Sequence, residues 1–153
     1  VLIGMPGCGK TTVANLLSEL TGRKTTDTDD LIRAKSETEI PEIFAKHGEP
    51  YFRQLETEAL REVSKESGLI IATGGGIVKT PENLDLIRQN SVCVFLDTDL
   101  SKLDTAGRPL SLSTGVEQLY TERLPLYKAW SDLTYKTANL AQTAAQIKAD
   151  LSF

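Results

Sequence analysis

The sequence predicts an α/β fold in which a parallel β-sheet lies between two layers of helices. Two continuous apolar runs, Leu69–Ala72 and Val92–Leu96, are typical of strands that are buried on both faces. Helical patterns separate these runs, which gives the strand–helix alternation of a parallel sheet. A glycine-rich loop, Gly4–Thr11, joins an apolar run to a helical pattern near the start of the chain. We therefore expect a three-layer sandwich that binds its ligand at the carboxyl ends of the strands.

The remaining elements follow from the same patterns along the chain. Strands are predicted at Val1–Ile3, Lys24–Thr28, Leu69–Thr73, Val92–Leu96 and Leu133–Lys136. Helices are predicted at Lys10–Leu20, Asp30–Lys35, Ile40–Lys46, Tyr51–Ser67, Pro81–Gln89, Val116–Ala129 and Asn139–Leu151. Thr80 is expected to cap the helix that Pro81 opens, and Pro125 is expected to disrupt the helix around it.

Length and composition indicate one globular domain over residues 1–153. The chain is 40% hydrophobic and 25% charged, and its net charge of −4 argues against a nucleic-acid or anionic membrane surface. The two cysteines, Cys8 and Cys93, fit no metal-ligand spacing and favour a cytoplasmic location. We expect a monomer. The first strand is short and the initiator Met is missing, which predicts a truncated N-terminus or a domain excised from a longer chain. In such a longer chain, the domain would be fused to another domain.

The loop Gly4–Thr11 has the form G-x-x-x-x-G-K-[ST], and its position between a strand and a helix predicts a nucleoside-triphosphate site. Backbone N–H groups and the helix N-terminus hold the polyphosphate in such a loop. Lys10 is expected to reach the β- and γ-phosphates, and the Thr11 hydroxyl is expected to ligate Mg²⁺. The predicted nucleotide contacts are Gly7, Cys8, Gly9, Lys10, Thr11 and Thr12.

Residues with special chemistry follow the second and third predicted strands. Asp27 and Asp29 lie at the end of the second strand. One carboxylate is available to the metal ion, and the other is available to an acceptor substrate. Asp29 or Thr28 is also a candidate N-cap for the next helix, a role compatible with catalysis. Three glycines follow the third strand, where they allow close backbone approach and offer N–H donors to a ligand: Gly74, Gly75 and Gly76.

Three arginines are candidate anion ligands. Arg53 begins a long predicted helix, and Glu56 lies three residues later on the same face, where it can fix the guanidinium. Arg108 lies in the turn-rich segment Gly107–Leu110, and Arg123 lies near Pro125. A single arginine is more often a solvated surface residue, so these three gain weight only through the pattern they form together.

This pattern resembles the shikimate kinase family. The resemblance runs from Val1 to about Ala129 and is more specific than the glycine loop alone. It consists, in order, of Gly4–Thr12, Asp27–Asp29, Ile43-Phe44, Gly48-Glu49, Phe52-Arg53 with Glu56, Gly74–Gly76, Gly107–Leu110 and Arg123–Tyr127. It implies a P-loop kinase of the nucleoside-monophosphate-kinase-like group, with a five-stranded parallel sheet in the order 2-3-1-4-5. It also implies transfer of the ATP γ-phosphoryl group to the 3-hydroxyl of shikimate, in the pathway to aromatic amino acids.

The resemblance also assigns roles on the nucleotide side of the site. Lys10 stabilises charge on the transferring phosphoryl group, Thr11 binds Mg²⁺, and Asp27 holds the ion through water. Arg108 is catalytic and binds nucleotide as part of a lid at about residues 99–115.

On the acceptor side, helices at about residues 30–60 are expected to bind the substrate. Asp29 binds the shikimate hydroxyls and is the candidate base, and an ordinary aspartate pKa of ~3.9 would leave it ionised. Arg53 and Arg123 grip the carboxylate, while Gly74, Gly75 and Gly76 contact the substrate. Aromatic side chains are expected to form the wall behind it: Phe44, Tyr51 and Phe52.

In one respect the sequence departs from the family pattern. Only eleven residues, Asp97 to Gly107, lie before Arg108, where the family commonly has a longer helix with an arginine on the adenine ring. No arginine lies between Arg88 and Arg108. Two alternatives stay open on the sequence alone: another small-molecule kinase of this fold, such as a gluconate-type kinase, and a nucleotide-binding domain without turnover.

Overall fold

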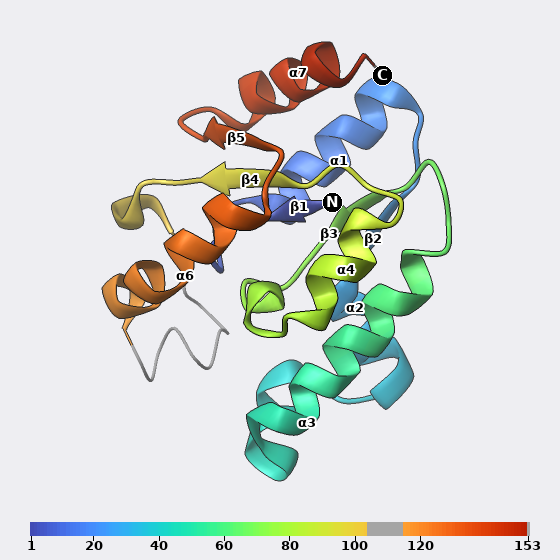
Figure 1. Ribbon diagram of the computed structural model, residues 1–153, viewed down its shortest axis with the longest axis vertical. Helices are drawn as coiled ribbons and strands as arrows, with labels where there is room; N and C mark the ends of the chain where they lie inside the picture. Colours follow the sequence, from blue (N-terminus) through green and yellow to red (C-terminus); the bar gives the residue numbers. More distant parts are fainter. Residues whose placement is uncertain (104–114, 153) are drawn as a thin grey trace.

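The structure is a computed structural model that describes residues 1–103 and 115–152 (Figure 1). One parallel five-stranded sheet runs through it in the order β2-β3-β1-β4-β5, as predicted. The strands are β1 (Leu2–Ile3), β2 (Thr25–Asp27), β3 (Ile70–Ala72), β4 (Val94–Asp97) and β5 (Leu133–Lys136). The three-layer α/β fold expected from the sequence is confirmed.

Helices cover both faces of the sheet. The α-helices are α1 (Lys10–Thr21), α2 (Thr28–Ser36), α3 (Ile40–Val63), α4 (Glu82–Arg88), α6 (Val116–Trp130) and α7 (Leu140–Leu151), and the short 3-10 helices are η1 (Ile77–Lys79) and η2 (Leu100–Lys102). Helices α1 and α7 pack together on one face, and α4 and α6 lie on the other (Figure 1). None of the described helices combines the length and hydrophobicity that a membrane span would need.

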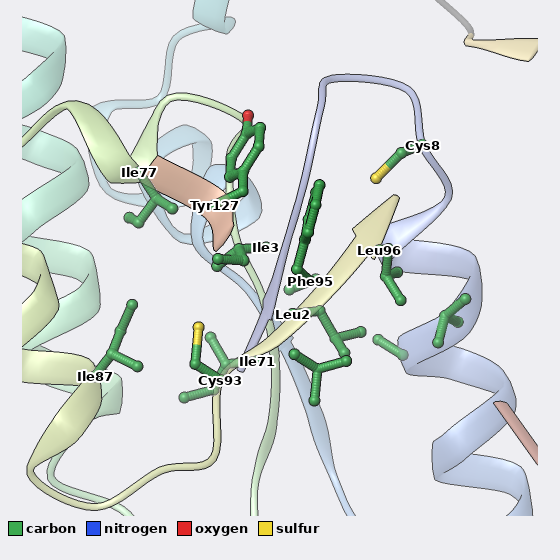
Figure 2. Packing of buried hydrophobic residues seen from close by; sticks show 14 of the residues in the cluster. Leu2, Ile3, Cys8, Ile71, Ile77, Ile87, Cys93, Phe95, Leu96 and Tyr127 are labelled. Carbon is green, nitrogen blue, oxygen red and sulfur yellow. The ribbon is translucent and has the colours of Figure 1, made fainter. Parts of the chain in front are cut away.

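The main core lies between the sheet and these helices. Neighbouring strand residues point to opposite faces, yet both Phe95 and Leu96 of β4 are fully buried. Phe95 stacks on Tyr127 of α6, with ring centroids 5.0 Å apart (Figure 2). The apolar runs of the sequence are therefore continuous because both faces of the sheet are covered.

A second, smaller core joins α2 to α3. Ile32 of α2 packs with Ile43, Phe52 and Ala59 of α3, and all four side chains are buried. Helix α2 begins directly after the carboxyl end of β2, so this cluster fixes α3 beside that end of the strand.

Helix α3 differs from the two helices predicted at residues 40–46 and 51–67. It is assigned as one helix from Ile40 to Val63, with a kink at Gly48, where φ is 80° and ψ is 172°. A side chain would be strained in this conformation, so glycine allows the chain to turn between the two helical segments. The predicted break is thus present as a kink.

Two expectations about proline are wrong. Helix α6 continues through Pro125, because Tyr127 and Trp130 beyond it are buried and hold the last turn against the sheet. Helix α4 begins at Glu82, so Pro81 occupies the cap position and the Thr80 side chain does not cap it.

Candidate active site

A cavity of about 720 Å³ opens at the carboxyl ends of the strands, the location predicted for the ligand. Its size lies within the range of small-molecule sites. The predicted site residues that line it come from separate parts of the chain: Gly7, Gly9, Lys10, Thr11, Thr12, Asp27, Asp29, Arg53, Gly74, Gly75, Gly76 and Arg123. The fold therefore brings these residues to one place.

Gly4–Thr11, which we call the phosphate loop after the role predicted for it, connects β1 to α1. Gly9 has a φ of 98° at the N-cap of α1, a left-handed conformation that favours glycine. The Lys10 ammonium donates hydrogen bonds to the carbonyls of Gly4 and Met5, both at 2.9 Å. Cys8 does not line the cavity, because its side chain is buried and its N–H donates to the Met5 carbonyl at 3.2 Å.

Thr11 and Asp27 meet at the mouth of the cavity. The Thr11 hydroxyl donates to Asp27 Oδ2 at 2.7 Å, and Asp27 Oδ1 accepts a hydrogen bond from the Asp29 N–H at 2.8 Å. Asp27 is therefore the N-cap of α2, whereas the sequence suggested Asp29 or Thr28. A hydroxyl and a carboxylate side by side supply the hard oxygen ligands that suit Mg²⁺, so this pair fits the metal role predicted for it.

Arg53 of α3 is held between two carboxylates. Its Nε donates to Glu49 Oε1 at 3.2 Å and its Nη1 donates to Glu56 Oε1 at 3.0 Å. Glu56 is fully buried, and this burial raises the pKa of its carboxyl to about 7 despite the opposing effect of Arg53. The spacing of three residues on one helix face placed Glu56 against Arg53, as expected.

Asp29 differs from the ordinary aspartate that the sequence suggested. Its Oδ1 is enclosed, and burial, followed by the nearby Asp27 charge, raises the pKa of its carboxyl. An aspartate with a raised pKa holds a proton more readily than an exposed one.

Gly74–Gly76, which we call the acceptor loop after the role predicted for it, lies against these charged side chains. A Cβ on Gly74 would lie 2.9 Å from Glu56 Oε2 and 3.1 Å from Asp29 Oδ1, and a Cβ on Gly76 would overlap the Arg53 guanidinium. The glycines therefore give room to the protein's own ionic groups as well as to a ligand.

Three buried polar atoms of this cluster have no hydrogen-bond partner within the described part of the chain. They are Asp29 Oδ1, Glu56 Oε2 and Arg123 Nε. An unsatisfied buried polar group costs about 1–3 kcal/mol, so a ligand that pairs with these atoms gains affinity. A donor such as a hydroxyl suits the two carboxylate oxygens, and an anion suits the Arg123 guanidinium.

Comparison with known proteins places the chain in a family. A family model described as shikimate kinase matches residues 6–152. The chain belongs to the shikimate kinase family. A shikimate kinase of Clostridium beijerinckii is 44% identical over an alignment of 139 positions, and the alignment covers 86% of this chain and 81% of the relative.

Solved structures agree with this family assignment. A shikimate kinase of Acinetobacter baumannii in complex with shikimate has a TM-score of 0.92 and 34% identity, and the match covers 99% of this chain and 91% of that one. A shikimate kinase of Aquifex aeolicus has a TM-score of 0.85 and 31% identity, with 99% and 94% covered.

The structure of this member of the shikimate kinase family also corrects the aromatic wall. Phe44 and Phe52 line the cavity, and their ring centroids are 4.7 Å apart. Tyr51 does not line it, because the ring is exposed and lies against His47. Arg108 lies outside the described residues, as does most of the lid expected at about residues 99–115.

Arg33 and Leu140 are among the cavity residues that were missed from the sequence. Arg33 lines the cavity and lies one helical turn after Asp29, a spacing of four residues that could have drawn attention to it. Leu140 at the start of α7 also lines the cavity and lies against Gly9, 131 residues away in the chain. No local sequence pattern predicts a contact between residues so far apart in the chain.

Proposed function

We propose that this chain transfers the γ-phosphoryl group of ATP to the 3-hydroxyl of shikimate, with shikimate 3-phosphate and ADP as products. The observation that carries the proposal is a single cavity that contains Lys10 of the phosphate loop together with Asp29, Arg53 and Arg123. Membership of the shikimate kinase family supports the same acceptor.

Two arginines suit the acceptor's carboxylate. Shikimate is small and polar, so its affinity must come mainly from charge-assisted hydrogen bonds, each of about 1.5–3 kcal/mol. The guanidinium fork matches a carboxylate in geometry, and Arg53 is already oriented by Glu49 and Glu56. Arg123 is almost fully buried, so its charge acts in a region that excludes water.

Asp29 is placed to orient the attacking hydroxyl. In the reaction, a bond forms between the 3-oxygen of shikimate and the γ-phosphorus, and the bond from that phosphorus to the oxygen it shares with the β-phosphate breaks. The hydroxyl proton passes to Asp29, whose raised pKa makes it a better acceptor than an exposed aspartate. The transition state is loose, so positioning and charge neutralisation contribute more than strong base catalysis.

Thr11 and Asp27 would hold Mg²⁺ in this proposal, Asp27 through water. When bound, the ion neutralises charge on the β- and γ-phosphates. Lys10 adds a positive charge on the same side, after its ammonium leaves the loop carbonyls that it contacts in the structure. The phosphates are also contacted by Gly7, Gly9 and Thr12 in this proposal.

We also propose that the domain acts as a monomer and lies in the cytoplasm, a location that its two cysteines favour. Light scattering after size-exclusion chromatography tests the oligomeric state.

A coupled ADP-release assay tests the proposed activity. The chain is supplied with ATP and Mg²⁺ and with shikimate, gluconate or no acceptor. ADP release that requires shikimate supports the proposal. Release with gluconate alone would assign a different acceptor, and release in none of the three mixtures would contradict kinase activity.

A further inference from the structure

Tyr127 lies one helical turn after Arg123 on α6, and its side chain is fully buried. Its ring stacks on Phe95 of β4, with an angle of 23° between the ring planes (Figure 2). The sheet therefore fixes the ring from one side, and the phenolic hydroxyl has little freedom to change its position.

The hydroxyl of Tyr127 lies where the two substrate loops meet. It donates a hydrogen bond of 2.5 Å to the carbonyl of Gly75 in the acceptor loop, and Met5 Sδ of the phosphate loop is 4.0 Å away. Gly75 in turn packs on Pro6, since a Cβ on Gly75 would lie 2.6 Å from Pro6 Cδ and 2.8 Å from Pro6 N. Burial raises the pKa of the Tyr127 hydroxyl above its usual range although the nearby Arg123 charge opposes the rise, and the hydroxyl is a donor at neutral pH.

We infer that Tyr127 is a positioning residue that sets the separation between the acceptor loop and the phosphate loop. This inference rests on the proposed function, in which one loop contacts the acceptor and the other holds the triphosphate. Helix α6 then fixes the acceptor site at two points, through Arg123 in the cavity and through Tyr127 behind Gly75.

Such a role affects the chemical step more than binding. Each substrate contacts its own loop, so each binds even when the two loops shift relative to one another. Transfer requires the acceptor oxygen and the γ-phosphorus to be close and aligned, and a displacement of about 1 Å can reduce the rate roughly a hundredfold. Removal of the hydroxyl alone leaves the ring stacked on Phe95 and shifts the loops by less than this distance. We therefore expect kcat to fall about tenfold.

The variant Tyr127→Phe removes this hydroxyl and keeps the ring. We expect its kcat with shikimate to fall about tenfold at a temperature where the variant is fully folded, with the Kd values for shikimate and ADP within about twofold of wild type. Tyr135→Phe is the matched control, because it removes a tyrosine hydroxyl that donates to Asp150 on α7, and its kcat should equal that of wild type.

The outcomes separate this inference from the proposed function. No shikimate-dependent ADP release by the wild-type chain would contradict the proposed function itself. An active wild type together with a folded Tyr127→Phe of unchanged kcat would overturn the positioning role alone, as would a loss limited to thermal stability. If Tyr127→Phe does not fold, Gly75→Ala, which forces the loops apart at Pro6, must lower kcat at saturating shikimate and ATP, and an unchanged kcat would overturn the inference.

Discussion

Replacement of Glu56 by glutamine removes a carboxylate that the fold holds in an unfavourable place. Burial raises the pKa of this carboxyl from 4.5 to about 7, although Arg53 and Arg123 oppose the rise. The folded chain therefore binds the proton more tightly than the unfolded chain does. The stability that this proton contributes is fully present below pH 4.5 and is lost as the pH rises through 7.

The size of the effect follows from the two pKa values. A difference between 4.5 and about 7 corresponds to about 3 kcal/mol in the free energy of unfolding, and roughly 2 to 3 kcal/mol of it falls between pH 5 and pH 8. The neutral side chain of Glu56→Gln resembles protonated Glu56. We therefore expect the stability of the variant relative to wild type to rise by about this amount between pH 5 and pH 8.

Urea unfolding of both proteins across this pH range measures the difference. Glu58→Gln is the matched control, because Glu58 is exposed on the same helix, and the stability of this control relative to wild type should change little with pH. A stability difference between Glu56→Gln and wild type that stays constant from pH 5 to pH 8 would refute the account of a buried Glu56 with a raised pKa.

Three further substitutions test separate parts of the site. Arg123→Ala should raise KM for shikimate about 10- to 100-fold through the loss of charge-assisted hydrogen bonds, with the Kd for ADP unchanged by calorimetry; unaltered shikimate kinetics would refute the carboxylate role. Gly76→Ala should displace the Arg53 guanidinium and raise KM for shikimate about tenfold, and an unchanged KM would show that Arg53 does not act from its present position. Thr11→Val should lower kcat roughly a hundredfold at saturating ATP, and retention of wild-type kcat and Mg²⁺ dependence would remove Thr11 from the metal site.

The features that the sequence predicted correctly are local or repetitive. Continuous apolar runs separated by helical patterns predicted the parallel sheet. The runs are continuous because Phe95 and Leu96 point to opposite faces of the sheet and both side chains are buried. The form of Gly4–Thr11 is contiguous, and it predicted the loop between β1 and α1 without any long-range information. The resemblance to the shikimate kinase family supplied the strand order, which no local pattern encodes.

The features that were missed depend on contacts between distant segments. The raised pKa of Asp29 arises from burial that the sequence does not reveal. The hydrogen bond from Tyr127 to Gly75 joins residues 52 positions apart, and Leu140 reaches the cavity from the last helix. The Tyr51 prediction failed because its neighbour Phe52 takes the inward face of α3, which leaves the Tyr51 ring on the surface.

The central claim is that the γ-phosphoryl group of ATP is transferred to the 3-oxygen of shikimate, whose carboxylate is held by Arg53 and Arg123. Phosphorus NMR of a reaction that contains the chain, ATP, Mg²⁺ and shikimate tests it most directly. The account predicts a new phosphate-ester signal that couples to the proton on carbon 3 of shikimate and grows in step with ADP. Release of inorganic phosphate without an ester, or an ester at another hydroxyl, would contradict it.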